Sequence, residues 1–232
     1  MPMNDLIVGL FALSSVLVTP TPSQAQIMPV AVVEQTPVLA HEELDLITRL
    51  PNPFGAQVFA DNILLSLHHL KGDEANFKLE AEKSYQVANM DWEGIEEPFS
   101  VEFTLQPGEV FAFHGNILPE FAGQVVKTMD SDFSADEGYK ALAGLYGNGV
   151  CHLASLVNWV ASEAGLEVTA KVNHDFYPVP GVARVYGTSI FYAPIGHNSQ
   201  NQNLYIKNTL DQPVTFVFNA NNGKVDLVIK KW

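Results

Sequence analysis

The spacing of apolar residues predicts a helix that begins at the only cysteine of the chain. After Cys151, apolar residues stand at 153, 156, 157, 160 and 161, and Gly165 closes the segment. Steps of three and four residues place these side chains on one helix face, and glycine commonly ends a helix. Residues 57–72 show the same pattern and end at Gly72. A shorter helix is expected at 41–50, before the proline-rich residues 51–55 break the chain.

Alternating apolar residues predict strands in the rest of the chain, mostly in its last third. The expected strands are 100–105 and 110–113, joined by a turn at 106–109, followed by 166–172, 184–193, 203–210, 213–220 and 224–231. Residues 221–223 (NNG) are typical of a tight hairpin. Helices and strands are segregated along the chain, which indicates an α+β fold. We expect the helix that begins at Cys151 to pack on a mostly antiparallel sheet.

Three further segments complete the expected organisation. Residues 6–18 are apolar but shorter than the roughly 20 residues that span a bilayer, and small residues follow at 23 and 25. This pattern predicts a signal peptide at 1–25 and export to the cell envelope or outside the cell. A wrong start site or a buried apolar segment is the alternative, because no Lys or Arg precedes the run. Cleavage and retention as a signal anchor both stay open. We expect a lead-in at 26–53 and one domain at 54–232, with an insertion at 73–98. The polar, glycine-rich residues 130–149 have the length of a functional loop.

Composition narrows the classes of function. The chain is 47% hydrophobic and 16% charged, which is typical of a folded protein. Its formal net charge of −14 argues against nucleic-acid binding, because phosphate backbones repel acidic surfaces. A single cysteine rules out an internal disulfide and disfavours a cysteine-based zinc site. Motifs for other metal sites, phosphate-binding loops and dinucleotide binding are absent, so we expect neither metal nor cofactor.

The position of Cys151 suggests a reactive thiol. It follows Gly147, Asn148 and Gly149 at a predicted helix start, where free N–H groups and the helix dipole favour a thiolate. The same N–H groups could hold an oxyanion beside the sulfur. The alternative is a small buried residue, which is common for free cysteine.

A thiolate nucleophile needs a base, and histidine usually provides it. His174 follows the strand after the predicted helix, so a helix–turn–strand hairpin returns it towards Cys151. His152 is adjacent to Cys151 but points elsewhere on the helix, and His114 is a third candidate. We expect simpler positions for the remaining histidines: His68 and His69 in mid-helix with at least one exposed, His41 and His197 in loops. The carboxylate pairs Asp130/Asp132 and Asp136/Glu137 are most simply a solvated face.

Five segments together form a recognisable pattern: LQPGEVFAFHG (105–115), DEGYK (136–140), the glycine–cysteine turn with its helix (147–168), NHDFYPV (173–179) and the closing strands (203–229). This combination resembles the VanW-like domain family of bacterial cell-envelope proteins. The resemblance covers roughly residues 54–231. Some members are L,D-transpeptidases, which form 3-3 cross-links in peptidoglycan through a cysteine thioester.

The resemblance implies Cys151 as nucleophile, His174 as base and peptidoglycan stem peptides as partners. The apolar N-terminal segment adds the expectation of a peripheral or signal-anchor association with the membrane. This chain departs from the family pattern in carrying His152 for glutamine and Asn148 for glycine. Residues 187–190 (GTSI) replace a segment with an aspartate, so a carboxylate that could orient His174 is missing unless Asp175 turns inward. A non-catalytic peptidoglycan-binding domain is therefore the alternative function.

Overall fold

The computed structural model describes residues 37–48, 50–79, 89–193 and 198–232. The predicted signal peptide and residues 26–36 of the expected lead-in lie outside these ranges. Within them, no helix is both long and apolar enough to cross a membrane.

The larger sheet joins the two ends of the described chain. Its strands are β1 (Val38–Asp45), β4 (Phe99–Leu105), β11 (Val214–Asn221) and β12 (Lys224–Lys231), in the order β1-β12-β11-β4 and all antiparallel. Asn222 and Gly223 have φ of 50° and 72°, the left-handed values that a tight hairpin needs. The predicted hairpin is confirmed, and β1 adds to its outer strand from a segment expected to be a lead-in.

The second sheet has the order β6-β5-β10-β9. It consists of β5 (Val110–Ala112), β6 (Val125–Lys127), β9 (Glu167–Ala170) and β10 (Leu204–Lys207), with only β5 and β6 parallel. Two-residue strands form two small ladders, β2 (Lys78–Leu79) with β3 (Asn89–Met90), and β7 (Ala141–Leu142) with β8 (Leu145–Tyr146). Short 3-10 turns occur at Glu74–Phe77, Pro119–Phe121, Ala135–Glu137, Arg184–Tyr186 and Ser199–Asn201.

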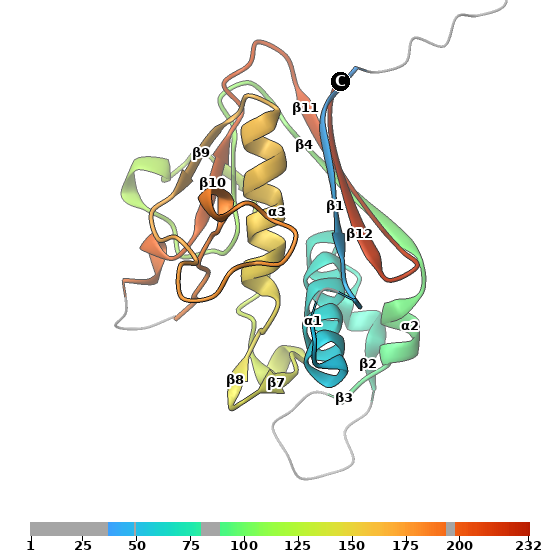
Figure 1. Cartoon of the computed structure of the whole chain (residues 1–232). Helices are drawn as coiled ribbons and strands as arrows, with labels where there is room; N and C mark the ends of the chain where they lie inside the picture. Colours follow the sequence, from blue (N-terminus) through green and yellow to red (C-terminus); the bar gives the residue numbers. More distant parts are fainter. Residues whose placement is uncertain (1–36, 49, 80–88, 194–197) are drawn as a thin grey trace, which may run out of the picture. The chain divides into compact units, whose positions relative to one another are not determined.

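Helix α3 (Val150–Glu163) lies between the two sheets (Figure 1). It packs against β1 and β12 on one side and against β9 and β10 on the other, and it also contacts α1 (Pro53–Lys71). Leu153, Leu156, Val157 and Val160, the predicted apolar face, are fully buried. The α+β class and the central helix beginning beside Cys151 are confirmed.

Helix α1 begins earlier than expected because Pro53 starts the helix. Asn52 is the N-cap, and its side-chain oxygen accepts the N–H groups of Phe54 and Gly55. Proline suits the first turn, where its missing N–H is not needed. Gly72 ends the helix with φ of 81°, as predicted. The short helix α2 (Trp92–Glu96) and the β2–β3 ladder occupy the expected insertion.

Two local predictions were wrong. Residues 41–45 extend β1 instead of forming a helix, because pairing with β12 and burial of Ala40 and Leu44 stabilise the strand. Residues 184–193 are not a strand but a 3-10 turn followed by an irregular segment. The predicted strand–turn–strand at 100–113 is confirmed, and its turn carries the chain from one sheet to the other.

Candidate active site

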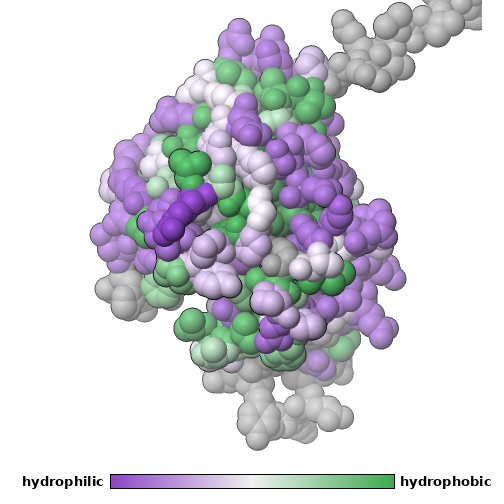
Figure 2. All heavy atoms as spheres, in the orientation of Figure 1, coloured by the Kyte–Doolittle hydropathy of each residue, from purple (hydrophilic) through white to green (hydrophobic). Residues whose placement is uncertain are grey.

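A cavity of ≈ 860 Å³ opens at the start of α3. Its walls come from the loop at 132–149, the first turn of α3, the loop around His174 and the irregular segment at 189–192. Every predicted site residue lines it: Gly147, Asn148, Gly149, Cys151, His152 and His174. Hydrophobic side chains lie exposed around the opening, including Leu145 and Tyr146 on β8, and Figure 2 shows such side chains over this part of the surface.

The Cys151 thiol is half-buried and bonded to one backbone residue. The Ile190 N–H donates to Sγ at 3.3 Å, and the thiol donates to the Ile190 carbonyl at 3.6 Å. Burial raises the pKa of the Cys151 thiol, while the backbone N–H groups of Ile190 and Cys151 itself lower it. The net direction is upward, so the free protein holds a neutral thiol.

His174 is buried and held in one tautomer. Its Nδ1 lies 2.8 Å from the Tyr177 carbonyl oxygen. A carbonyl can only accept, so Nδ1 carries the hydrogen and Nε2 of the neutral ring carries a lone pair. Nε2 has no hydrogen-bond partner among the residues that the structure describes. In the described part of the chain no hydrogen bond joins it to Cys151, although both side chains line the same cavity.

His152 stands between the cavity and α1. Its ring makes edge contacts with His174 and with Phe59, at centroid distances of 5.9 and 4.9 Å. It therefore packs the base candidate against α1 as well as lining the cavity.

Gly149, two residues before Cys151, allows the start of α3 to pack closely against α1. Gly149 is the N-cap of α3 with φ of 104°, and a Cβ there would lie 2.5 Å from the Phe59 carbonyl oxygen. Only glycine fits both the left-handed backbone and this close approach to α1. The N–H groups of Val150 and His152 donate to the carbonyls of Gly147 and Gly149. The donors beside the sulfur are therefore those of Cys151 and Ile190, the second of which sequence reasoning missed.

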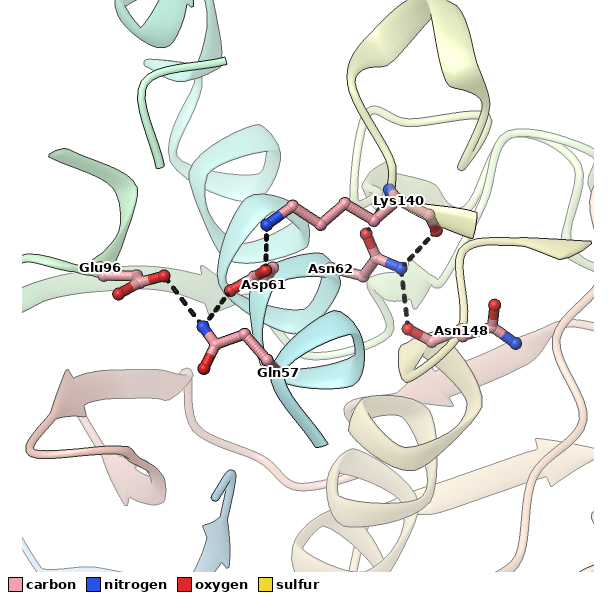
Figure 3. Close-up of polar contacts among 6 residues, drawn as sticks. All are labelled: Gln57, Asp61, Asn62, Glu96, Lys140 and Asn148. Carbon is pink, nitrogen blue, oxygen red and sulfur yellow. Dashed lines mark hydrogen bonds and ion pairs between the residues drawn. The ribbon is translucent and has the colours of Figure 1, made fainter. Parts of the chain in front are cut away.

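Polar residues of α1 anchor the loop that leads to Cys151 (Figure 3). The Asn62 amide donates to the carbonyls of Lys140 and Asn148 at 2.9 Å and accepts the Lys140 N–H at 2.8 Å. Lys140 also forms an ion pair with Asp61, which is fully buried. The Asn148 side chain accepts the N–H of Leu142 at 2.9 Å. Asp61 and Asn62 were missed, although two adjacent polar residues inside an apolar helical segment were a usable signal.

Side chains of α3 hold the irregular segment that carries Ile190. Ser155 Oγ donates to the Cys151 carbonyl at 2.7 Å and accepts the Thr188 N–H at 2.9 Å. The Asn158 amide donates to the Tyr186 carbonyl and to Thr188 Oγ1. These bonds fix the backbone two residues before Ile190, and so place its N–H on the sulfur.

The other histidines have structural positions, two of which differ from expectation. His68 and His69 are both buried, so the expected exposed member of the pair is absent. His41 lies on β1 and pairs with Asp226, not in a loop, and His197 lies outside the described residues. His114 uses both ring nitrogens, with the Gln202 carbonyl and the Asn116 N–H, and burial lowers its pKa to about 4.

Asp175 does not replace the missing carboxylate. It pairs with Arg184, and both side chains are about two-thirds exposed. The Tyr177 carbonyl occupies the orienting position at His174 instead. In the portion of the chain with described coordinates, no group of three or more His, Cys, Asp or Glu side chains could hold a metal ion.

The molecule is thus an α+β protein with a cysteine and a histidine in one cavity at the start of a central helix. The chain belongs to the family described as VanW like protein, which matches residues 101–230 and is associated with the cell envelope. The match runs from β4 into β12 and leaves α1 outside. No curated protein and no solved structure matches the chain.

Proposed function

We propose that the protein is an exported, cysteine-dependent acyltransferase of the L,D-transpeptidase type, acting on peptidoglycan stem peptides. One observation carries the proposal: Cys151 at the start of α3 shares a cavity with His174, whose Nε2 has a lone pair and no other partner among the described residues. A nucleophile and a base held on separate elements around one hollow are the parts that acyl transfer needs.

The reaction begins with proton transfer from the thiol to His174. The sulfur attacks the carbonyl carbon of the peptide bond that joins the third residue of a tetrapeptide stem to its terminal D-Ala. The tetrahedral oxyanion that forms accepts hydrogen bonds from the backbone N–H groups beside the sulfur. His174 gives the proton to the departing D-Ala amine, and a thioester forms. An amine of a second stem then attacks the thioester and restores the thiol.

Substrate binding has to change the partners of the sulfur. In the free protein the thiol donates to the Ile190 carbonyl, and catalytic hydrogen bonds often tighten only once substrate is bound. Because Tyr177 fixes the tautomer of His174, this site works without the carboxylate of the family pattern.

The contacts of Cys151 also support a second candidate, a non-catalytic peptidoglycan-binding domain. Burial raises the thiol pKa, and the thiol bonds to Ile190, not to a base. The exposed aromatic side chains Phe176, Tyr177 and Phe191 around the cavity would serve either function, because exposed apolar patches mark binding sites.

Incubation with disaccharide-tetrapeptide separates the two candidates. Mass spectrometry should show a thioester adduct on Cys151 and 3-3 cross-linked dimers, and Cys151→Ala and His174→Gln should lose both. His114→Gln is the matched control, because this buried histidine is bonded on both ring nitrogens away from Cys151. A Cys151→Ala protein that retained all product would sink the mechanism. If the protein sedimented with peptidoglycan but formed neither the thioester adduct nor cross-linked dimers, the result would favour the non-catalytic binding domain.

A further inference from the structure

We propose that Asp132 and Asp136 form the acceptor side of the cavity, where a primary ammonium group of the second stem peptide binds. The inference rests on the proposed function and deepens it by assigning the residues that recognise the acceptor. Both aspartates line the cavity that Cys151 and His174 share.

The charge of the cavity lining favours a cation. Among the described residues around the cavity there are two carboxylates and neither Lys nor Arg. The carboxylates beside them in sequence have other partners: Asp130 pairs with Lys127, and Glu137 binds backbone N–H groups. Asp132 and Asp136 are both exposed and free of any ion pair with a described Lys or Arg, so their charge is presented to the cavity.

The backbone presents Asp132 in a fixed geometry. The Glu137 carboxylate accepts the N–H groups of Asp132 at 2.9 Å and Ser134 at 3.1 Å, and the Ser131 hydroxyl at 3.0 Å. Phe133, between the two N–H donors, has φ of 59°, which is uncommon for a bulky residue. Such local strain persists only where the surroundings impose it, and it clusters at ligand sites.

His174 provides a second observation at the same cavity. Only 6% of its surface is exposed, it lines the cavity, and its Nε2 lacks a hydrogen-bond partner in the described part of the chain. The free lone pair of this nitrogen is suited to receive a proton from a bound amine.

Chain connectivity brings Asp132 near the sulfur. The Tyr192 hydroxyl interacts with Asp132, and Tyr192 follows by two residues Ile190, whose N–H donates to Cys151 Sγ. The segment at 190–192 therefore contacts both Asp132 and Cys151, and an ammonium group held at Asp132 would share one cavity with a thioester on Cys151.

The transfer step balances without another reactant. The bound ammonium loses one proton to solvent, and the neutral nitrogen attacks the thioester carbonyl. The carbon–sulfur bond breaks as the amide forms, and the second nitrogen proton passes to His174 Nε2. His174 then returns that proton to the Cys151 thiolate, which restores the resting pair.

The test uses Asp132→Asn, which keeps the size of the side chain and removes its charge. We expect the KM for the acceptor to rise about tenfold and cross-linked product to fall relative to hydrolysed donor, as loss of one charge-assisted hydrogen bond predicts. Detection of the thioester adduct in the variant shows that it is folded and acylated. Asp130→Asn is the matched control on the same loop and should change neither quantity, because Asp130 pairs with Lys127.

A binding experiment separates failure of this inference from failure of the proposed function. Cadaverine and the neutral pentanol are titrated into Cys151→Ala protein, with and without Asp132→Asn. Cadaverine alone should bind, with about tenfold weaker affinity in the double variant. Equal cadaverine affinity in both proteins, or an unchanged KM for the acceptor, would overturn the acceptor site. Absence of any thioester adduct with the wild-type protein would instead overturn the proposed function.

Discussion

The state of the Cys151 thiol follows from a balance of two opposing effects. Burial disfavours the charged thiolate, whereas the helix N-terminus and the N–H groups of Ile190 and Cys151 favour it. Burial is the larger effect, so the pKa is raised and the resting thiol is neutral. A neutral thiol that donates to a backbone carbonyl is protected until a base or a substrate changes its surroundings.

Alkylation by iodoacetamide should report this balance directly, because the chain has one cysteine. Only the thiolate reacts, and a raised pKa means that less thiolate is present at a given pH. The pH midpoint of the folded protein should therefore lie above that of the same protein in urea, where the thiol titrates near ~8.5. Mass spectrometry at a series of pH values gives both curves. A folded midpoint below the unfolded one would show that the helix N-terminus outweighs burial.

At the scale of elements, α3 positions the reactive residue and also the segment that touches it. Ser155 lies one turn after Cys151 and bonds to the Thr188 N–H. Replacing Ser155 by Ala removes this bond and the one to the Cys151 carbonyl, and should lower stability by about 1–2 kcal/mol.

The same variant should make Cys151 more reactive. Once the segment loosens, the sulfur gains solvent, and relief of burial outweighs loss of the Ile190 N–H because burial is the larger effect. Iodoacetamide should label Ser155→Ala faster than wild type at pH 8. Ser162→Ala is the control, since the Ser162 hydroxyl bonds to Asn158 one turn earlier and not to the irregular segment. Equal labelling rates in all three proteins would mean that Ser155 does not position the segment.

The glycine turn makes a second prediction at this scale. Gly149→Ala places a Cβ 2.5 Å from the Phe59 carbonyl oxygen at φ of 104°, so backbone must move. Gly108→Ala has a similar φ of 85° and no atom within 4 Å of the added Cβ. Gly108→Ala should lower the free energy of unfolding by about 1 kcal/mol from backbone strain alone. Gly149→Ala should lower it by about twice as much or more. Urea unfolding measures both, and equal losses would contradict the packing role of Gly149.

Sequence reasoning predicted most of the regular elements and failed at 41–45, which belong to β1, and at 184–193, where the backbone is irregular. The apolar spacing of α1 and α3 and the alternation of β12 were sufficient to predict these elements, although both helices are buried on nearly all sides. Residues 184–193 alternate like a strand, yet the N–H groups of Thr188 and Ile190 donate to α3 side chains and not to a neighbouring strand. Cys151 and His174 were placed at one site by a helix–turn–strand argument. Their partners Ile190 and Tyr177 use backbone atoms, which no residue pattern reveals.

For the whole molecule, one polar network connects the cavity loop to α1. Lys140 pairs with the buried Asp61 and stacks over Trp92 at 3.9 Å from the ring centre, while Gln57 bridges Asp61 and Glu96. Lys140 lies in the family-matched region, whereas Asp61 precedes it. The loop that supports Cys151 therefore depends on a helix outside that region.

Removing Lys140 should destabilise the protein because it leaves the Asp61 carboxylate buried with only a neutral partner, Gln57. Lys140→Met preserves the apolar stem and should lower the free energy of unfolding by about 3 kcal/mol. Asp61→Asn combined with Lys140→Met removes both charges and should recover most of that loss, since the uncompensated buried charge is the main cost.

Lys127→Met is the surface control, because its partner Asp130 is 59% exposed and such pairs contribute little. Urea unfolding of the wild type and these three variants measures each loss. If the double variant were no more stable than Lys140→Met, the loop would be held by the Asn62 hydrogen bonds and not by the ion pair.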